Sequence, residues 1–186
     1  MRKIGVIFGG MSTEHEVSIS SGTSIISNLD KQKYEILPIY ISKSGEWYKY
    51  TKPVNDIIPL HVGDEITELE KIENEFECLK SLDIAFPVLH GLYGEDGTIQ
   101  GLLELLKIKY VGCKVLSSSI CMDKVYAKIV FDKAQIPQAD YAYVKAEKGK
   151  YTYVHKNFDE ETLDLDQICK KIESKLGLPV FVKPSN

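Results

Sequence analysis

A glycine-rich stretch in the middle of the chain limits its possible folds more than any other segment. Residues 90–97, His-Gly-Leu-Tyr-Gly-Glu-Asp-Gly, join an apolar run (84–89) to a segment with helical apolar spacing (99–106). Its glycines allow positive φ angles and a close approach of the backbone to other groups. An imidazole and two carboxylates share this turn, at the carboxyl end of an expected strand, where open α/β sheets bind ligands. The alternative is a polar strand–helix connection without a ligand.

The N-terminus has the same strand–turn–helix pattern. Residues 3–8 form an apolar run, as expected of a strand buried on both faces of a parallel sheet, and Gly9 and Gly10 end it. Thr13 and Glu16 have the spacing of a capping box, which predicts a helix start. A strand, a glycine turn and a helix N-terminus together favour an anion or a polar ligand. The glycines do not follow the G-x-G-x-x-G pattern, which disfavours a dinucleotide site.

Further elements alternate along the first part of the chain. Residues 34–41 and 46–50 are expected strands, and apolar spacing predicts an amphipathic helix over residues 66–82. Residues 108–111 are a short expected strand. This alternation predicts an α/β fold, with an N-terminal Rossmann-like doubly wound parallel sheet in residues 1–120.

A second part follows and is expected to contain two helices and two extended segments: a helix from residue 120 to about 134, an extended segment at 136–144, a helix at 166–176 and a strand at 180–184. Gly177 and Pro179 form the expected stop signal of the second helix. The chain stops directly after the last strand, so we expect this second domain to be incomplete.

Composition excludes several classes of protein. Of the 186 residues, 44% are hydrophobic and 27% charged, as in ordinary globular proteins. The net charge of −4 does not indicate the excess of positive charge that is typical of proteins that bind nucleic acid. No apolar run approaches the ~20 residues that span a bilayer, and the N-terminal run is too short for a secretory signal. The cysteines form no C-x-x-C pair, which favours reduced thiols in a cytoplasmic protein: Cys78, Cys113, Cys121 and Cys169.

Five motifs occur in one order along the whole chain. They are Gly9-Gly10-x-Ser12-x-Glu14-x-x-Val17-Ser18, His90-Gly91-x-x-Gly94-Glu95-Asp96-Gly97-x-x-Gln100-Gly101, Tyr110-x-Gly112, Ser117-Ser118-x-x-x-Met122-Asp123-Lys124 and Pro179-Val180-Phe181-Val182-Lys183-Pro184. With these motifs the chain resembles the D-alanine–D-alanine ligases of bacterial cell-wall synthesis. The resemblance implies an N-terminal α/β substrate-binding domain (pre-ATP-grasp domain) at residues 1–120 and the first part of an ATP-grasp domain at 121–186.

The same resemblance implies an activity. It is the ATP-dependent ligation of two D-alanines to D-alanyl-D-alanine through an acyl phosphate, for peptidoglycan precursors in the cytoplasm. The substrates are D-alanine and ATP, with Mg²⁺ as cofactor; neither nucleic acid nor membrane is an expected partner, and a homodimer is considered. The family continues into a phosphate loop, a lid and a C-terminal metal-binding lobe that are absent here. We therefore expect the metal ligands in that absent half, and no turnover by residues 1–186 alone.

The resemblance also implies roles for single residues. Glu14 matches the carboxylate that binds the ammonium group of the first amino acid, and His90 matches the histidine beside it; these two are the expected catalytic residues. Val17 and Ser18 complete the expected substrate-binding set, together with Glu14 and His90.

Two lysines are expected to bind the nucleotide. Lys124 and Lys183 match the family's lysines that hold the phosphates of ATP, and lysine suits phosphate as a compact point charge. Glu95 and Asp96 are expected to shape the turn and cap the next helix. His15 has no evident partner and is expected at the surface.

Two other functions remain open from the sequence. Ligases that place D-serine or D-lactate at the second position share all five motifs, so the second substrate is not determined. A non-catalytic α/β module that binds a small molecule is the rival from another class; bound NAD or flavin at Gly9 and Gly10 would favour it.

Overall fold

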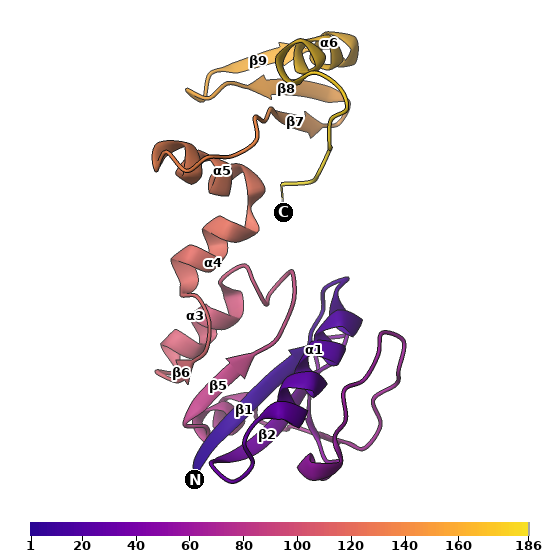
Figure 1. Cartoon of the computed structure of the whole chain (residues 1–186), viewed down its shortest axis with the longest axis vertical. Helices are drawn as coiled ribbons and strands as arrows, with labels where there is room; N and C mark the ends of the chain where they lie inside the picture. Colours follow the sequence, from indigo (N-terminus) through magenta and orange to yellow (C-terminus); the bar gives the residue numbers. More distant parts are fainter. Residues whose placement is uncertain (186) are drawn as a thin grey trace. The chain divides into compact units, whose positions relative to one another are not determined.

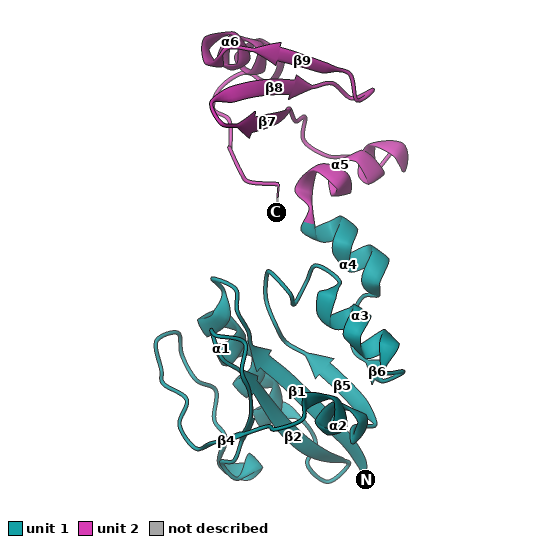
Figure 2. Cartoon of the chain, turned by 180° about the vertical axis from the view of Figure 1, so that it is seen from behind, with its two compact units in different colours: residues 1–122 teal, residues 123–186 magenta. Residues whose placement is uncertain are grey.

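The computed structural model describes residues 1–185. The chain divides into two compact units, residues 1–122 and the residues from Asp123 onward (Figure 2). Each unit has its own sheet and is described by itself. Among the described helices, none combines the length and the apolar character that crossing a membrane requires.

A six-stranded sheet forms the centre of the first unit, in the order β4-β3-β2-β1-β5-β6. Strands β2, β1, β5 and β6 are labelled in Figure 1. Strand β1 (Arg2–Gly9) pairs in parallel with β2 (Tyr34–Ile41) on one side and with β5 (Ile84–Pro87) on the other. The remaining strands extend the sheet in parallel at one edge and antiparallel at the other: β6 (Lys109–Tyr110), and β3 (Trp47–Tyr50) with β4 (Leu69–Lys71). The predicted mixed α/β fold with a mainly parallel sheet is confirmed.

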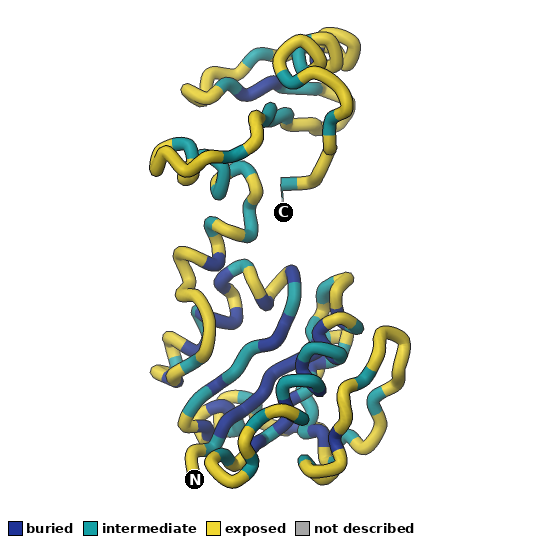
Figure 3. The backbone as a smooth tube through the Cα atoms, viewed as in Figure 1, coloured by how far each residue is buried: buried dark blue, intermediate teal, exposed yellow. Residues whose placement is uncertain are grey.

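One face of this sheet is covered by helix α1 (His15–Asn28). Phe8 of β1 and Ile26 of α1 are both completely buried there, and the short 3₁₀ helix η1 (Val54–Asp56) lies beside α1. Gly22 lets the helix approach the strand, because a Cβ at this position would lie 2.5 Å from the Cβ of Phe8. The buried path of β1 through the unit is visible in Figure 3.

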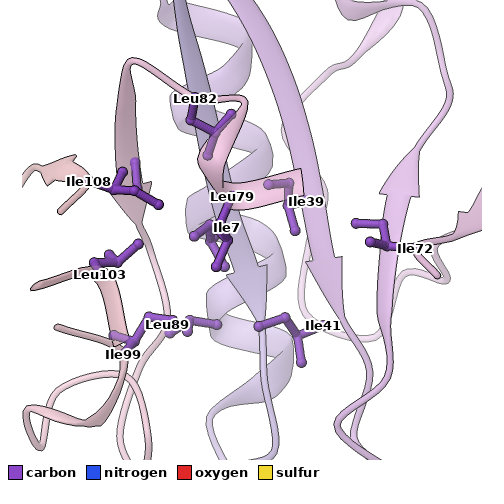
Figure 4. Packing of buried hydrophobic residues seen from close by; sticks show 11 residues of the cluster. Ile7, Ile39, Ile41, Ile72, Leu79, Leu82, Leu89, Ile99, Leu103 and Ile108 are labelled. Carbon is purple, nitrogen blue, oxygen red and sulfur yellow. The ribbon is translucent and has the colours of Figure 1, made fainter. Parts of the chain in front are cut away.

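The opposite face packs against helices α2 (Glu75–Lys80) and α3 (Thr98–Leu105). Ile7 of β1 lies in one buried cluster with Leu79 of α2 and Leu103 of α3 (Figure 4). Successive side chains of a strand point to opposite faces, so adjacent residues of β1 contribute to different clusters. This two-sided burial explains the nearly continuous apolar run in the sequence.

The helix predicted over residues 66–82 is wrong in its first half. That half contains strand β4, which pairs with β3, and helix α2 starts only after Asn74. The Asn74 side chain caps α2 by accepting a hydrogen bond from the N–H of Glu77 (3.1 Å). Backbone pairing at the sheet edge, with burial of Ile72, outweighs the helical spacing, because propensity is weak beside tertiary contacts.

The single helix predicted from residue 120 to about 134 is also corrected. Helix α4 (Val115–Met122) begins earlier, and α5 (Lys124–Lys133) is a separate helix. Asp123 separates the two helices, because it is the N-cap of α5. Its carboxylate accepts hydrogen bonds from free N–H groups at the start of α5, and the shorter of them comes from Val125 (2.9 Å). The division between the compact units falls at this residue.

The second unit contains α5, a three-stranded antiparallel sheet and one more helix: β7 (Tyr143–Glu147), β8 (Lys150–Val154), β9 (Glu160–Leu163) and α6 (Leu165–Leu176). A capping box starts α6, where Gln167 N–H donates to Asp164 Oδ1 (2.8 Å) and Asp164 N–H donates to Gln167 Oε1 (3.0 Å). The predicted helix at 166–176, ending at Gly177, is confirmed.

Of the two extended segments predicted in this unit, one is a strand only at its end and the other is not a strand. Strand β7 covers only the end of the segment predicted at 136–144. Residues 180–184 are not a strand, and Phe181 and Val182 are both 92% exposed. A strand needs partners for its N–H and C=O groups, and no strand among residues 1–185 provides them here. An apolar run alone therefore does not establish a strand.

Candidate functional site

Two loops meet at the carboxyl edge of the parallel sheet. One leads from β1 into α1, and the other leads from β5 into α3. Ser18 of α1 joins them, since its hydroxyl accepts a hydrogen bond from Gly9 N–H (2.9 Å) and donates one to Val88 C=O (2.6 Å). Ser18 has no exposed surface. The buried hydroxyl of Ser18 therefore holds the two loops together, and its substrate contact stays a prediction.

The predicted pair Glu14 and His90 lies in these two loops. The Ser12 hydroxyl donates to the C=O of His90 (2.6 Å) and accepts from the N–H of Glu14 (3.1 Å). The Glu14 carboxylate lies against Gly91, where a Cβ would be 2.8 Å from Glu14 Oε2. The structure thus brings the acid at position 14 to the residue that directly follows the imidazole at position 90.

His90 is held on both sides of its ring. Its Nε2 lies 3.1 Å from the hydroxyl of Ser21 on α1, and its Nδ1 lies 4.0 Å from a carboxylate oxygen of Glu95. The side chain remains 32% exposed. Val17, another predicted substrate contact, is 44% exposed on α1. An oriented imidazole with open surface is suited to bind a polar ligand.

Glu95 and Asp96 shape the turn, as predicted, but the N-cap residue of α3 is Gly97, which has no side-chain cap. Glu95 accepts a hydrogen bond from Gly91 N–H (2.8 Å), and Asp96 accepts from the N–H groups of Tyr93 and Thr98 (both 2.9 Å). Burial alone would raise the pKa of Asp96, but the backbone hydrogen bonds from Thr98 and Tyr93 favour the charged form more strongly. The pKa of Asp96 therefore lies below its ordinary value.

The capping box predicted from Thr13 and Glu16 is wrong. Helix α1 begins at the residue after Glu14, and no side chain caps it there. Glu16 pairs instead with Lys43 (3.1 Å). The exposed Glu14 carboxylate makes no hydrogen bond or ion pair within residues 1–185. It is therefore available for a cationic group of a ligand.

His15 is buried, contrary to the expectation that it lies at the surface. It is 4% exposed, and its ring contacts Gly10 and Tyr40. A sequence signal for this was present, because His15, Ile19 and Ile26 lie on one face of the helix at spacings of four and seven residues.

The two predicted nucleotide-binding lysines both lie in the second unit. Lys124 begins α5; its N–H donates to the C=O of Ser185 (2.8 Å), and its Nζ lies 3.4 Å from the same oxygen. The Ser185 hydroxyl donates to Asp123 (2.6 Å). The segment that carries the exposed Lys183 is thus held to the start of α5. Residues 1–185 contain no group of three His, Cys, Asp or Glu side chains that could hold a metal ion.

An unpaired carboxylate and an imidazole thus lie at the carboxyl edge of parallel strands, which is the place where open α/β proteins bind their ligands. Residues 3–113 match the family model of the D-ala D-ala ligase N-terminus. The chain therefore belongs to the D-alanine–D-alanine ligase family, and the resemblance found in its motifs is confirmed.

Curated relatives cover the whole chain. A D-alanine–D-alanine ligase from Caldicellulosiruptor bescii is 46% identical over 99% of this chain and 50% of its own length. One from Clostridium acetobutylicum is 48% identical over 100% of this chain and 50% of its own length. The chain thus spans about half the length of the curated relatives that it matches.

Solved structures agree with the fold. VanG D-Ala:D-Ser ligase from Enterococcus faecalis has a TM-score of 0.69 and 35% identity, over 99% of this chain and 52% of its own. The D-alanine–D-alanine ligase from Bacillus anthracis complexed with ATP has a TM-score of 0.57 and 32% identity, over 95% of this chain and 55% of its own.

Proposed function

We propose that this protein is an ATP-dependent ligase that joins two D-alanines to D-alanyl-D-alanine, for peptidoglycan precursors in the cytoplasm. One observation carries the proposal: an unpaired carboxylate, Glu14, lies at the carboxyl edge of the sheet against the turn of His90. Membership of the ligase family and the names of the relatives support it.

Glu14 would bind the α-ammonium group of the first D-alanine by charge, with His90 beside it and the open side of Val17 near the substrate methyl group. Fixing the ammonium group orients the adjacent carboxylate for reaction, and orientation can supply several kcal/mol of a barrier. Ser18 would act indirectly, because its hydroxyl holds the ends of β1 and β5 together.

Lys124 and Lys183 would hold the phosphates of ATP. Both side chains are exposed. The hydrogen bond from Lys124 N–H to Ser185 C=O holds the segment that carries Lys183 to the start of helix α5. ATP supplies the phosphoryl group that activates the substrate carboxylate as an acyl phosphate. Mg²⁺ belongs to the proposal, but the described residues 1–185 lack a ligand cluster that fits it, so we assign it no ligand and no step.

A D-alanine–D-serine ligase is the second candidate. The similarity to VanG over 99% of this chain favours it, because that protein is described as a D-Ala:D-Ser ligase. The two candidates are separated by their products. The complete protein encoded by the gene is incubated with ATP, D-alanine and either D-serine or D-lactate, and the products are identified by their mass. Sedimentation equilibrium in the same buffer tests for a homodimer.

The role of Glu14 is tested by calorimetric titration with D-alanine. Glu14→Gln keeps the shape but removes the charge, and we expect D-alanine affinity to fall about tenfold to a hundredfold, the worth of a charge-assisted hydrogen bond. Glu16→Gln is the matched control, since Glu16 pairs with Lys43 and should leave affinity within about twofold. Equal affinities of wild type and Glu14→Gln would contradict the assignment.

A further inference from the structure

His15 has a polar environment inside the first unit. Its ring is buried, with Nδ1 2.5 Å from the carbonyl oxygen of Gly10 and Nε2 3.2 Å from the hydroxyl of Tyr40. The ring meets Tyr40 edge-on, with centroids 5.6 Å apart. Two directed contacts at opposite ends of one ring fix its orientation, which simple filling of the core would not require.

The partners determine where the proton is. A carbonyl oxygen only accepts, so the His15 Nδ1 must carry the hydrogen that it donates to Gly10. In the neutral ring Nε2 then accepts from the phenol of Tyr40. Burial, and secondarily the neighbouring Tyr48, raises the pKa of Tyr40, so this phenol keeps its proton at neutral pH. A neutral His15 therefore has both nitrogens satisfied.

The atom that His15 holds belongs to the loop between β1 and α1. The Gly10 N–H donates to the C=O of Ile41 at the end of β2 (2.8 Å), and the Gly10 C=O accepts from His15. Gly10 has a φ of +93°, a conformation that glycine adopts freely. The loop is thus attached to β2 directly through Gly10 and indirectly through the ring and Tyr40. Glu14, directly before His15, takes its position from this loop.

We propose that His15 is a positioning residue of the amino-acid site: its ring fixes the β1–α1 loop, and thereby holds the Glu14 carboxylate against Gly91. The proposal rests on the proposed function of Glu14. The His15 ring itself is buried between Gly10 and Tyr40 and has almost no open surface for a ligand.

Two substitutions separate positioning from packing. His15→Leu fills the core but leaves the Gly10 carbonyl and the Tyr40 hydroxyl without their partner. His15→Asn places an amide N–H where Nδ1 stood, so it retains the bond to Gly10. A packing role predicts that leucine is tolerated better than asparagine, and the positioning role predicts the reverse.

The experiment uses the protein as its gene encodes it. In the wild type, ¹⁵N NMR of the ring should show the proton on Nδ1. His15→Leu should shift the Gly91 amide resonance and weaken D-alanine binding about tenfold, as expected for a lost hydrogen bond that positions a charge. His15→Asn should leave the Gly91 resonance in place and affinity within about threefold.

The outcomes separate this proposal from the proposed function. If wild type binds no D-alanine, the proposed function fails, while the Gly91 resonance still tests the positioning. A proton on Nε2, an unchanged Gly91 resonance in His15→Leu, or equal shifts in the leucine and asparagine variants would overturn the role of His15. Should His15→Leu not fold, Tyr40→Phe is the second variant, because it removes only the phenolic hydroxyl and keeps the ring. It must then shift the ring ¹⁵N signals of His15 and the Gly91 amide resonance, and the absence of both shifts would overturn the proposal.

Discussion

The carboxylate of Glu14 lies directly against the backbone of Gly91, so close that a methyl group on Gly91 would come within 2.8 Å of Glu14 Oε2. These residues are far apart in sequence and belong to loops after different strands. The contact depends on the parallel pairing of β1 and β5, which brings both loops to one edge of the sheet. The candidate site is therefore a property of the sheet order and not of either motif alone.

Gly91→Ala should damage both the fold and the site. Gly91 has a φ of +68°, where a non-glycine residue costs about 1–2 kcal/mol, and the added methyl would displace the Glu14 carboxylate. We expect a lower free energy of unfolding, measured by the fluorescence of Trp47, and about tenfold weaker D-alanine binding. Gly101→Ala is the control: it has no neighbour within 4 Å and should stabilise α3 by about 0.5–1 kcal/mol. Wild-type D-alanine affinity in Gly91→Ala would contradict the contact.

Ser18→Ala should lower the free energy of unfolding by about 1–3 kcal/mol. The substitution leaves the buried Gly9 N–H and Val88 C=O without a partner, and unsatisfied buried groups carry that cost. Ser20→Ala is the matched control on the same helix, because its hydroxyl has no hydrogen bond within residues 1–185 and alanine favours the helix. Urea unfolding followed at Trp47 measures both variants. Equal urea midpoints for wild type and Ser18→Ala would show that the hydroxyl of Ser18 does not join the strands.

The sequence predicted those parts of the fold that depend on local patterns. The apolar run of β1, the glycines of the turn at 90–97 and the stop signal at Gly177 all act within a few residues, and the structure contains each element. The parallel sheet followed from their alternation. The interpretation of Glu95 and Asp96 as turn residues succeeded for the same reason, since their hydrogen bonds are to neighbours in the chain.

The predictions from the sequence were wrong where contacts between residues far apart in the chain determine the structure. β4 forms because β3 offers an edge, and residues 180–184 are not a strand because no such edge reaches them among the described residues. The neighbours of His15 could not be found from its flanking residues, since Tyr40 meets it only after β1 and β2 pair. The proximity of Glu14 to the turn of His90 was expected from the family motifs, but its basis, the glycine at position 91, required the structure.

Acid should weaken the first unit through Asp96. Because the pKa of Asp96 is lowered in the folded chain from 3.8, its contribution to stability is fully present above about pH 4 and is lost as pH falls through the lowered pKa. Asp96→Asn, which loses charge and one acceptor, should reduce stability by about 1 kcal/mol at neutral pH. The difference from wild type should shrink below about pH 4. Urea unfolding at several pH values, followed at Trp47, measures this, and a difference that stays constant into acid would contradict it.

Asp123→Ala should loosen the start of α5. The Asp123 carboxylate caps this helix and accepts the Ser185 hydroxyl, and these hydrogen bonds outweigh burial to lower its pKa. Loss of an N-cap costs about 0.5–2 kcal/mol, so the amides of α5 should exchange with solvent up to about thirtyfold faster, as hydrogen exchange would show. Asp140→Ala, at an exposed aspartate that caps no helix, should leave α5 unchanged. Wild-type exchange rates for α5 in Asp123→Ala would contradict this, because they would mean that the carboxylate does not stabilise the helix.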